Sequence, residues 1–163
     1  MRTAKRADVV LEQIEAAYRA RYPVFLRVAI AIVGDVELAR DAVHDAFVRA
    51  VRHRRRFRGS GSIEPWLWRI VVNAARKRRG REREIPAELN ERAPPATPLN
   101  GDLRALVASL PERQRQALFL RYYADLDYQS IAEALGIKPG TVAASLHGAH
   151  EALRRRLQEA DDE

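Results

Sequence analysis

The chain has 163 residues, 47% of them hydrophobic, and a formal net charge of +7 at neutral pH. That length fits one ordinary domain or two small ones, with enough apolar side chains for a core. The absence of cysteine excludes a disulfide framework, a Cys-ligated zinc site and a thiol nucleophile. The longest apolar run, residues 28–33, is too short to cross a bilayer, so we expect a cytoplasmic protein without membrane insertion.

The charge is unevenly distributed between the two halves of the chain. Residues 1–85 hold 20 Lys and Arg against 10 Asp and Glu, a net charge of +10. Residues 86–163 hold 9 against 12, a net charge of −3. Because dense basic charge attracts phosphate, we expect salt-sensitive binding to nucleic acid in the first half.

Helical periodicity is the main structural signal in the first half. Apolar residues at steps of three and four predict helices over residues 9–20, 22–33 and 37–52. Pro23 is compatible with the first turn of the second helix, and Asp35 is suited to cap the third. We therefore expect three consecutive helices before the most basic part of the chain.

The most informative stretch runs from residue 49 to residue 83. It contains six arginines within residues 49–58, a Gly/Ser break at 59–62, two tryptophans, and a second basic run at 76–79. A helix from Pro65 to about residue 79 would have one packed side and one basic side. Arginine binds phosphate and base edges, and aromatic rings stack on unpaired bases. This composition predicts a nucleic-acid surface; the alternative is an ordinary solvated charged face.

A change in composition precedes the second half. Residues 80–101 hold four of the eight prolines, which predicts a flexible linker. Beyond the linker we expect only helices. A short apolar stripe runs from Leu103 to Leu110, and a helix capped by Ser109, with Pro111 near its first turn, follows it. We then expect a helix over 128–135, between Asp127 and Gly136, and a last helix from Thr141 to about Leu157. The last pair matches a helix-turn-helix. The predicted fold class is all-α, with two small helical domains.

Motifs in both halves resemble one family. The first half contains Ala39-Arg-Asp-Ala-Val-His-Asp-Ala-Phe47 and Trp66-Leu-Trp-Arg-Ile70, and the second contains Leu110-Pro-Glu-Arg-Gln-Arg115 and Tyr128-Gln-Ser-Ile-Ala-Glu133. In this order the motifs resemble bacterial RNA polymerase sigma factors of the extracytoplasmic-function (ECF) type. The resemblance implies a sigma-two four-helix domain at 1–80, a Pro-rich linker at 81–101 and a sigma-four helix-turn-helix domain at 102–163.

The resemblance also implies a docking surface for core RNA polymerase. The family docks on the clamp helices of the beta-prime subunit through one face of the helix at 37–52, and it also contacts the beta flap. The corresponding residues here are Asp41, His44, Asp45, Phe47 and Val48. The family commonly has Gln at His44 and Glu at Asp45, so the polar character is kept. The alternative is an ordinary solvent-exposed face.

The first domain would contact the minus-ten element and the melted promoter. For the two tryptophans, the alternative is packing in the core. The residues that match these family positions are Arg54, Arg55, Arg56, Arg58, Trp66, Trp68, Asn73, Arg76, Lys77, Arg78 and Arg79.

The second domain departs from the family at its recognition helix. The family usually carries basic residues where this chain has Ala143, Ser145, Gly148 and His150. Because lost phosphate contacts remove counterion release, we expect weaker and less salt-dependent minus-thirty-five binding. Either small side chains still read bases, or the domain has shifted toward protein contacts, as in a sigma-like regulator or adaptor. The candidate minus-thirty-five contacts are Lys138, Thr141, Ser145, His147 and His150.

Catalysis and metal binding receive little support from the sequence. His147, His150 and Glu151 have a spacing that could hold a metal, but they lack an evident second-shell partner. No nucleophile or acid/base pair is visible, so we expect no enzyme activity and no cofactor. The partners implied by the resemblance are core RNA polymerase, promoter DNA and an anti-sigma factor.

Overall fold

The protein is described by a computed structural model over residues 2–59, 61–83 and 101–161. The greater part of the predicted linker, residues 84–100, lies outside the described residues. The described ranges contain helices and no strand, which confirms the all-α prediction. In chain order the elements are α1 (Arg2–Val33), α2 (Val36–Arg52), the 3-10 helix η1 (Arg54–Arg56), α3 (Glu64–Arg83), α4 (Gly101–Ala108), α5 (Glu112–Tyr122), α6 (Tyr128–Leu135) and α7 (Pro139–Asp161).

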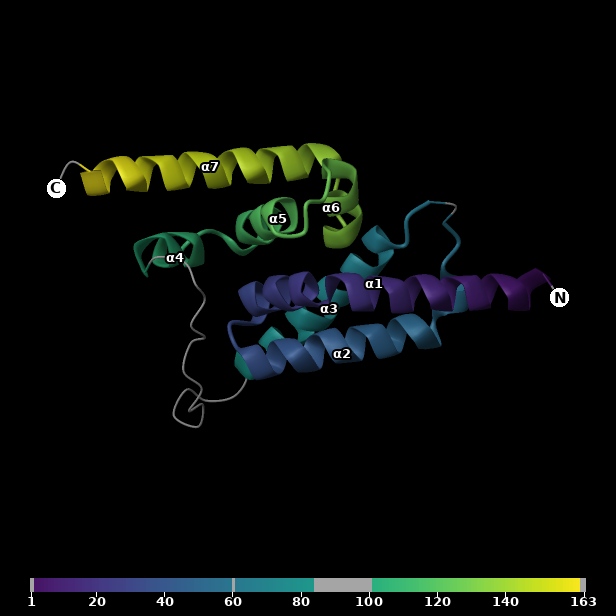
Figure 1. Cartoon of the computed structure of the whole chain (residues 1–163). Helices are drawn as coiled ribbons and strands as arrows, with labels where there is room; N and C mark the ends of the chain where they lie inside the picture. The colour runs from purple at the N-terminus through teal and green to yellow at the C-terminus, as the bar shows by residue number, and fades with distance from the viewer. Residues whose placement is uncertain (1, 60, 84–100, 162–163) are drawn as a thin grey trace.

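The first half is a bundle in which α1, α2 and α3 pack on one another (Figure 1). Its centre is aromatic: the ring centroid of Phe25 lies 4.2 Å from that of Trp68 and 5.2 Å from that of Phe47. Phe25 and Trp68 are completely buried. Burial of each such side chain contributes roughly 1.5–3 kcal/mol, so these rings hold the three helices together.

Several predicted helix ends are confirmed. The Asp35 carboxylate accepts a hydrogen bond of 2.8 Å from the backbone N–H of Leu38 at the start of α2. Asp127 caps α6 in the same way, accepting 2.7 Å from the Ser130 N–H. Gly136 ends α6 with φ of 67°, a left-handed conformation that glycine adopts without steric cost.

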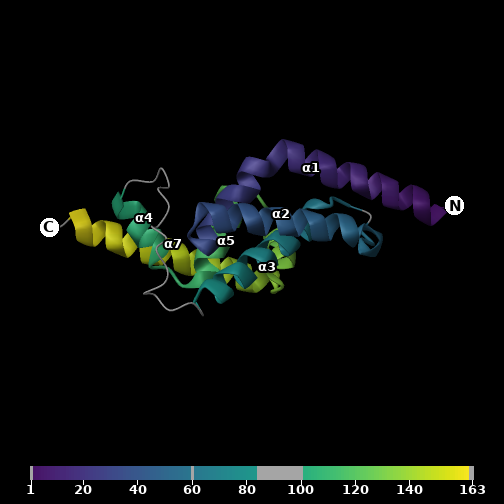
Figure 2. The same ribbon diagram turned by 90° about the horizontal axis from the view of Figure 1, so that it is seen from below.

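Two predicted boundaries are wrong. The break near residue 21 does not exist, because α1 continues through Pro23 to Val33. Proline removes one backbone hydrogen bond, but burial of residues on its C-terminal side, including Phe25 and Val28, keeps the helix continuous. Figure 2 shows that α1 bends along its length. Ser109 does not cap α5, because its hydroxyl donates to the Leu106 carbonyl at the end of α4 (2.6 Å).

The second half is built on α5, α6 and α7, with α6 and α7 forming the helix-turn-helix. Val142, Leu146 and Ala149 turn inward from α7. A Cβ added at Gly148 would lie 2.7 Å from the amide nitrogen of Gln114 on α5. That nitrogen is the end of a flexible side chain, so a small movement of Gln114 would relieve the contact, and the packing of α5 on α7 does not require glycine there.

The two halves pack against each other. Helix α3 packs on α6 and α1 packs on α5, and Figure 1 shows the second half lying along one side of the first. Buried apolar residues from both halves form one continuous cluster. None of the helices in the described ranges is long and apolar enough to cross a membrane.

Candidate functional site

The predicted polymerase-docking face lies on α2. Asp41, His44 and Val48 are exposed, and Asp45 is partly exposed. Phe47 was predicted to belong to this face, but this is wrong because its ring is buried in the aromatic core. It packs edge-on against Tyr18 with ring centroids 4.8 Å apart. The face therefore consists of one histidine, two carboxylates and one valine.

Arg78 connects this docking face to α3. Its guanidinium donates to Asp45 (2.6 Å) and lies 3.4 Å from a carboxylate oxygen of Asp41. The hydrogen bond to Asp45 raises the pKa of Arg78 above its ordinary value. A residue predicted to contact the promoter is thus paired with two residues predicted to contact the polymerase, and Asp41 and Asp45 share one partly buried cation.

The two tryptophans have different environments. The prediction that Trp68 contacts DNA is wrong for this structure, because the side chain is completely buried against Phe25. The alternative of core packing therefore holds for Trp68. Trp66 is only partly buried and packs on Phe57, with ring centroids 5.5 Å apart. Of the two rings, Trp66 alone keeps some exposed surface.

The basic side chains between α2 and α3 are mostly accessible. Arg55, Arg56 and Arg58 are exposed, whereas Arg54 is partly buried and donates to the backbone carbonyl of Val51 (2.8 Å). Exposed guanidinium groups can bind phosphate without first breaking an intramolecular contact. Three of the four predicted arginines in this segment are therefore available at the surface.

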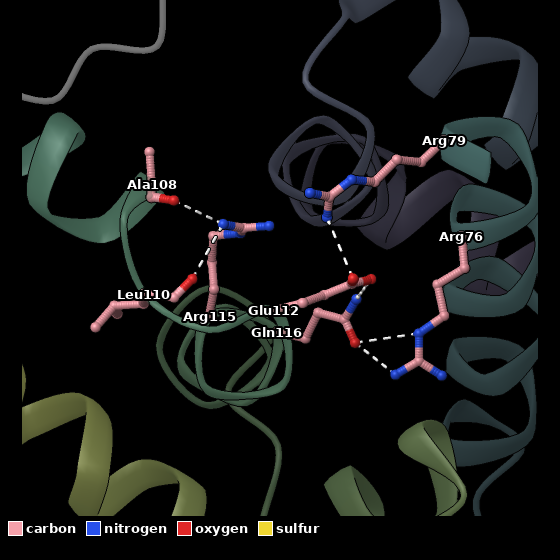
Figure 3. A network of polar contacts seen from close by, with 7 residues as sticks. All are labelled: Arg76, Arg79, Ala108, Leu110, Glu112, Arg115 and Gln116. Atoms are coloured by element: carbon pink, nitrogen blue, oxygen red, sulfur yellow. Dashed lines mark hydrogen bonds and ion pairs between the residues drawn. The ribbon is translucent and has the colours of Figure 1, made fainter. Parts of the chain in front are cut away.

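The basic run on α3 meets the second half of the chain (Figure 3). Arg76 donates to the side-chain oxygen of Gln116 through two nitrogens, one of them at 3.1 Å. Gln116 donates in turn to Glu112 (2.8 Å), whose other carboxylate oxygen lies 3.6 Å from Arg79. Burial lowers the pKa of Arg76, although the nearby Glu112 charge opposes that effect. By contrast, Asn73 and Lys77 are exposed.

The segment that carries Glu112 and Gln116 is itself held in place. Arg115 donates to the backbone carbonyls of Ala108 (2.8 Å) and Leu110 (3.3 Å), as Figure 3 shows. These bonds tie the connection between α4 and α5 to α5. The start of α5 is therefore fixed where its polar side chains face α3.

A second group of contacts joins α1 to the second half. Arg21 bonds to Glu64 at the start of α3 and to the backbone carbonyl of Ala124. The Arg27 guanidinium lies 6.0 Å from the centroid of the Tyr123 ring. Sequence reasoning missed Arg21, Glu112 and Gln116 as contact residues. Gln116 offered a signal, since it is a polar residue within an apolar helical stripe next to Ala117.

The candidate minus-thirty-five residues are only partly exposed. Ser145 is buried and its hydroxyl donates to the backbone carbonyl of Thr141 (2.8 Å), so its predicted DNA contact is wrong for this structure. Thr141 is partly buried, while Lys138, His147 and His150 are exposed. The Nε2 atom of His150 lies 2.9 Å from the hydroxyl of Tyr122, an exposed residue that the sequence did not mark. In the described parts of the chain, no three His, Asp or Glu side chains are arranged to hold a metal ion.

Comparison with known proteins identifies the two halves. Residues 17–85 match the family Sigma-70 region 2, and residues 100–153 match the family Sigma-70, region 4. The RNA polymerase sigma-H factor of Pseudomonas aeruginosa is 31% identical over 154 residues, covering 82% of this chain and 80% of that protein. The ECF RNA polymerase sigma-E factor of Escherichia coli K12 is 33% identical over 146 residues, covering 77% and 75%.

Solved structures share the fold of both halves. The sigma factor RpoE of Bartonella quintana, solved in complex with the anti-sigma factor NepR, has a TM-score of 0.72 at 21% identity, covering 88% of this chain and 96% of that one. CnrH, solved in complex with the cytosolic domain of CnrY, has a TM-score of 0.72 at 18% identity, covering 96% and 95%. The chain belongs to the ECF sigma factors of bacterial RNA polymerase. It is therefore a factor for promoter-directed transcription initiation.

Proposed function

We propose that this sigma factor binds core RNA polymerase through the α2 face formed by Asp41, His44, Asp45 and Val48. The observation that carries the proposal is that these side chains are exposed, or in Asp45 partly exposed, on one face of α2 beside the basic end of α3. On the polymerase, the clamp helices of the beta-prime subunit would receive this face, and the beta flap would receive the second domain. Opposite charge would orient the encounter and fix its register.

The minus-ten surface would be formed by the loop after α2 and the outer side of α3. Arg55, Arg56, Arg58, Asn73 and Lys77 are exposed there, and Trp66 keeps part of its ring accessible. Guanidinium groups would hold the phosphates while extruded bases enter the loop, at a cost of a few kcal/mol for unstacking. Trapping unpaired bases in this way would favour the open promoter.

The minus-thirty-five surface would be formed by the N-terminal half of α7 and the residue before it, with Lys138, His147 and His150 as exposed contacts. Because the helix lacks arginine and lysine between residues 139 and 153, base reading would depend on close approach of small side chains. The proposed domain boundaries are 1–80 and 102–163, joined by the linker at 81–101. An anti-sigma factor in the bacterial cytoplasm would bind this protein, as a structural neighbour was solved in complex with an anti-sigma factor.

Run-off transcription with core polymerase from genomic fragments tests the proposal. The Asp45→Arg variant places a cation beside Arg78 and should lower polymerase affinity about thirtyfold or more, with loss of transcripts. Asp8→Arg is the matched control, since it makes the same charge change at an exposed site on α1. Equal polymerase affinity of Asp45→Arg and Asp8→Arg would show that this α2 face is not the docking surface.

A further inference from the structure

The N-terminal half of α1 precedes the part of the chain that matches Sigma-70 region 2, which begins at residue 17. This half is nevertheless fixed in the bundle. Val10 and Ile14 are buried, and they belong to the same apolar cluster as Phe57, the residue directly after η1. Helix α1 packs on η1, and Figure 1 shows the segment after α2 passing beside this half of α1. The N-terminal half of α1 therefore forms one side of the loop between α2 and α3.

Arg6 is the polar side chain that reaches this loop from α1. Its Nη2 nitrogen lies 3.5 Å from the carbonyl oxygen of Gly59, the residue that follows Arg58. That distance is at the long end of the hydrogen-bonding range, so the contact is weak. A guanidinium group has five N–H donors, and in the described parts of the chain Arg6 has no other partner. Most of its donors can therefore bind a further acceptor at the loop.

The charge around Arg6 favours an anion as that acceptor. Arg55, Arg56 and Arg58 are exposed on the same loop, and within the described ranges no carboxylate forms an ion pair with these three arginines or with Arg6. The acidic residue closest in sequence, Asp8, lies about 200° around the helix from Arg6 at 100° per residue. Phosphate accepts charge-assisted hydrogen bonds from guanidinium at about 2.7–2.9 Å, which are stronger than the contact with Gly59.

We propose that Arg6 binds a backbone phosphate of the promoter strand that enters the loop between α2 and α3. The N-terminal half of α1 thereby extends the minus-ten surface beyond the residues that match the family. The contact with the Gly59 carbonyl keeps the guanidinium at the loop before DNA arrives. Because phosphate contacts carry no sequence information, Arg6 contributes affinity and not the choice of base. This inference rests on the proposed minus-ten role of the loop.

Arg6→Gln tests the charge of the side chain, because glutamine keeps an N–H donor for the Gly59 carbonyl and removes the cation. Arg19→Gln is the matched control. Arg19 lies on the same helix, about 20 Å away at 1.5 Å per residue, and its side chain is 82% exposed. Each full-length variant is assembled with core polymerase, and its affinity for a promoter fragment that the wild type transcribes is measured over a range of salt concentrations.

Arg6→Gln should weaken binding about fivefold at low salt. It should also reduce the slope of log affinity against log salt by about 0.7–0.9, the contribution of one phosphate contact. Arg19→Gln should change neither quantity, and Arg6→Lys should restore the slope, since an ammonium group also displaces a counterion. Equal slopes for Arg6→Gln and Arg19→Gln would overturn the inference.

A photocrosslink locates residue 6 relative to the DNA directly. The chain has no cysteine, so Arg6→Cys and Arg19→Cys each accept a single thiol-reactive aryl azide. In the open complex, the label at residue 6 should crosslink to promoter DNA and the label at residue 19 should not. If the wild type transcribes but the two labels crosslink to DNA equally, this inference alone fails. If the wild type makes no transcript from any genomic fragment, the proposed function fails and this inference fails with it.

Discussion

The nucleic-acid surfaces proposed for the two domains differ in charge. The first domain has exposed arginines after α2 and a basic run on α3, whereas the corresponding part of α7 has no lysine or arginine between residues 139 and 153. Their cores differ as well, since the first is centred on Phe25 and Trp68 and the second on aliphatic residues such as Leu120 and Ile131. Long-range charge attraction should therefore dominate in the first domain and close steric fit in the second.

The difference in basic charge indicates that the two surfaces contribute to binding in different ways. Among the basic residues of the first domain, Arg76, Arg78 and Arg79 each have an intramolecular partner, whereas Arg55, Arg56 and Arg58 are exposed. The exposed start of α7 carries no comparable charge. The exposed arginines after α2 should therefore give the first domain the stronger long-range attraction for nucleic acid.

The largest expected effect concerns the aromatic core of the first domain. Trp68→Ala should lower the free energy of unfolding by about 3–5 kcal/mol, because it leaves a cavity beside Phe25. Trp66→Ala is the control and should cost clearly less, since that ring is only partly buried. Urea titration followed by circular dichroism measures both. Equal losses would mean that the two rings share one environment, contrary to the structure.

An intermediate effect should appear in the salt dependence of promoter binding by holoenzyme. The double variant Arg55→Ala/Arg56→Ala should reduce the slope of log affinity against log salt by about 1.4–1.8, since each lost phosphate contact contributes about 0.7–0.9. The double variant His147→Ala/His150→Ala should reduce the slope less, because α7 has no lysine or arginine between residues 139 and 153. A larger slope change from the histidine pair than from the arginine pair would contradict the claim that charge attraction contributes more in the first domain than in the second.

The smallest effect concerns the cap of α6 in the second domain. Hydrogen bonding from the Ser130 N–H lowers the pKa of Asp127 below its ordinary value. The cap's contribution should therefore be fully present above the unfolded pKa of about 4 and be lost as pH falls through the lower folded pKa. Asp127→Ala should lower the thermal midpoint at pH 7, and this difference should shrink in strong acid. A constant difference across that range would show that the carboxylate charge is irrelevant.

Local physics made much of this protein predictable from sequence. The helix periods, the caps at Asp35 and Asp127, the stop at Gly136 and the family all followed from residues close together in the chain. These features depend on hydrogen bonds and side-chain spacing within a few turns, which a linear pattern records directly.

Tertiary structure alone decided which of the marked residues face solvent. Phe47 and Trp68 are buried against the α1 rings Tyr18 and Phe25 respectively, and Ser145 is buried on α7. The partners of Arg76 and Arg78 also come from segments more than thirty residues away, Gln116 and Asp45. No local pattern encodes such pairings, because they exist only when helices far apart in sequence pack side by side.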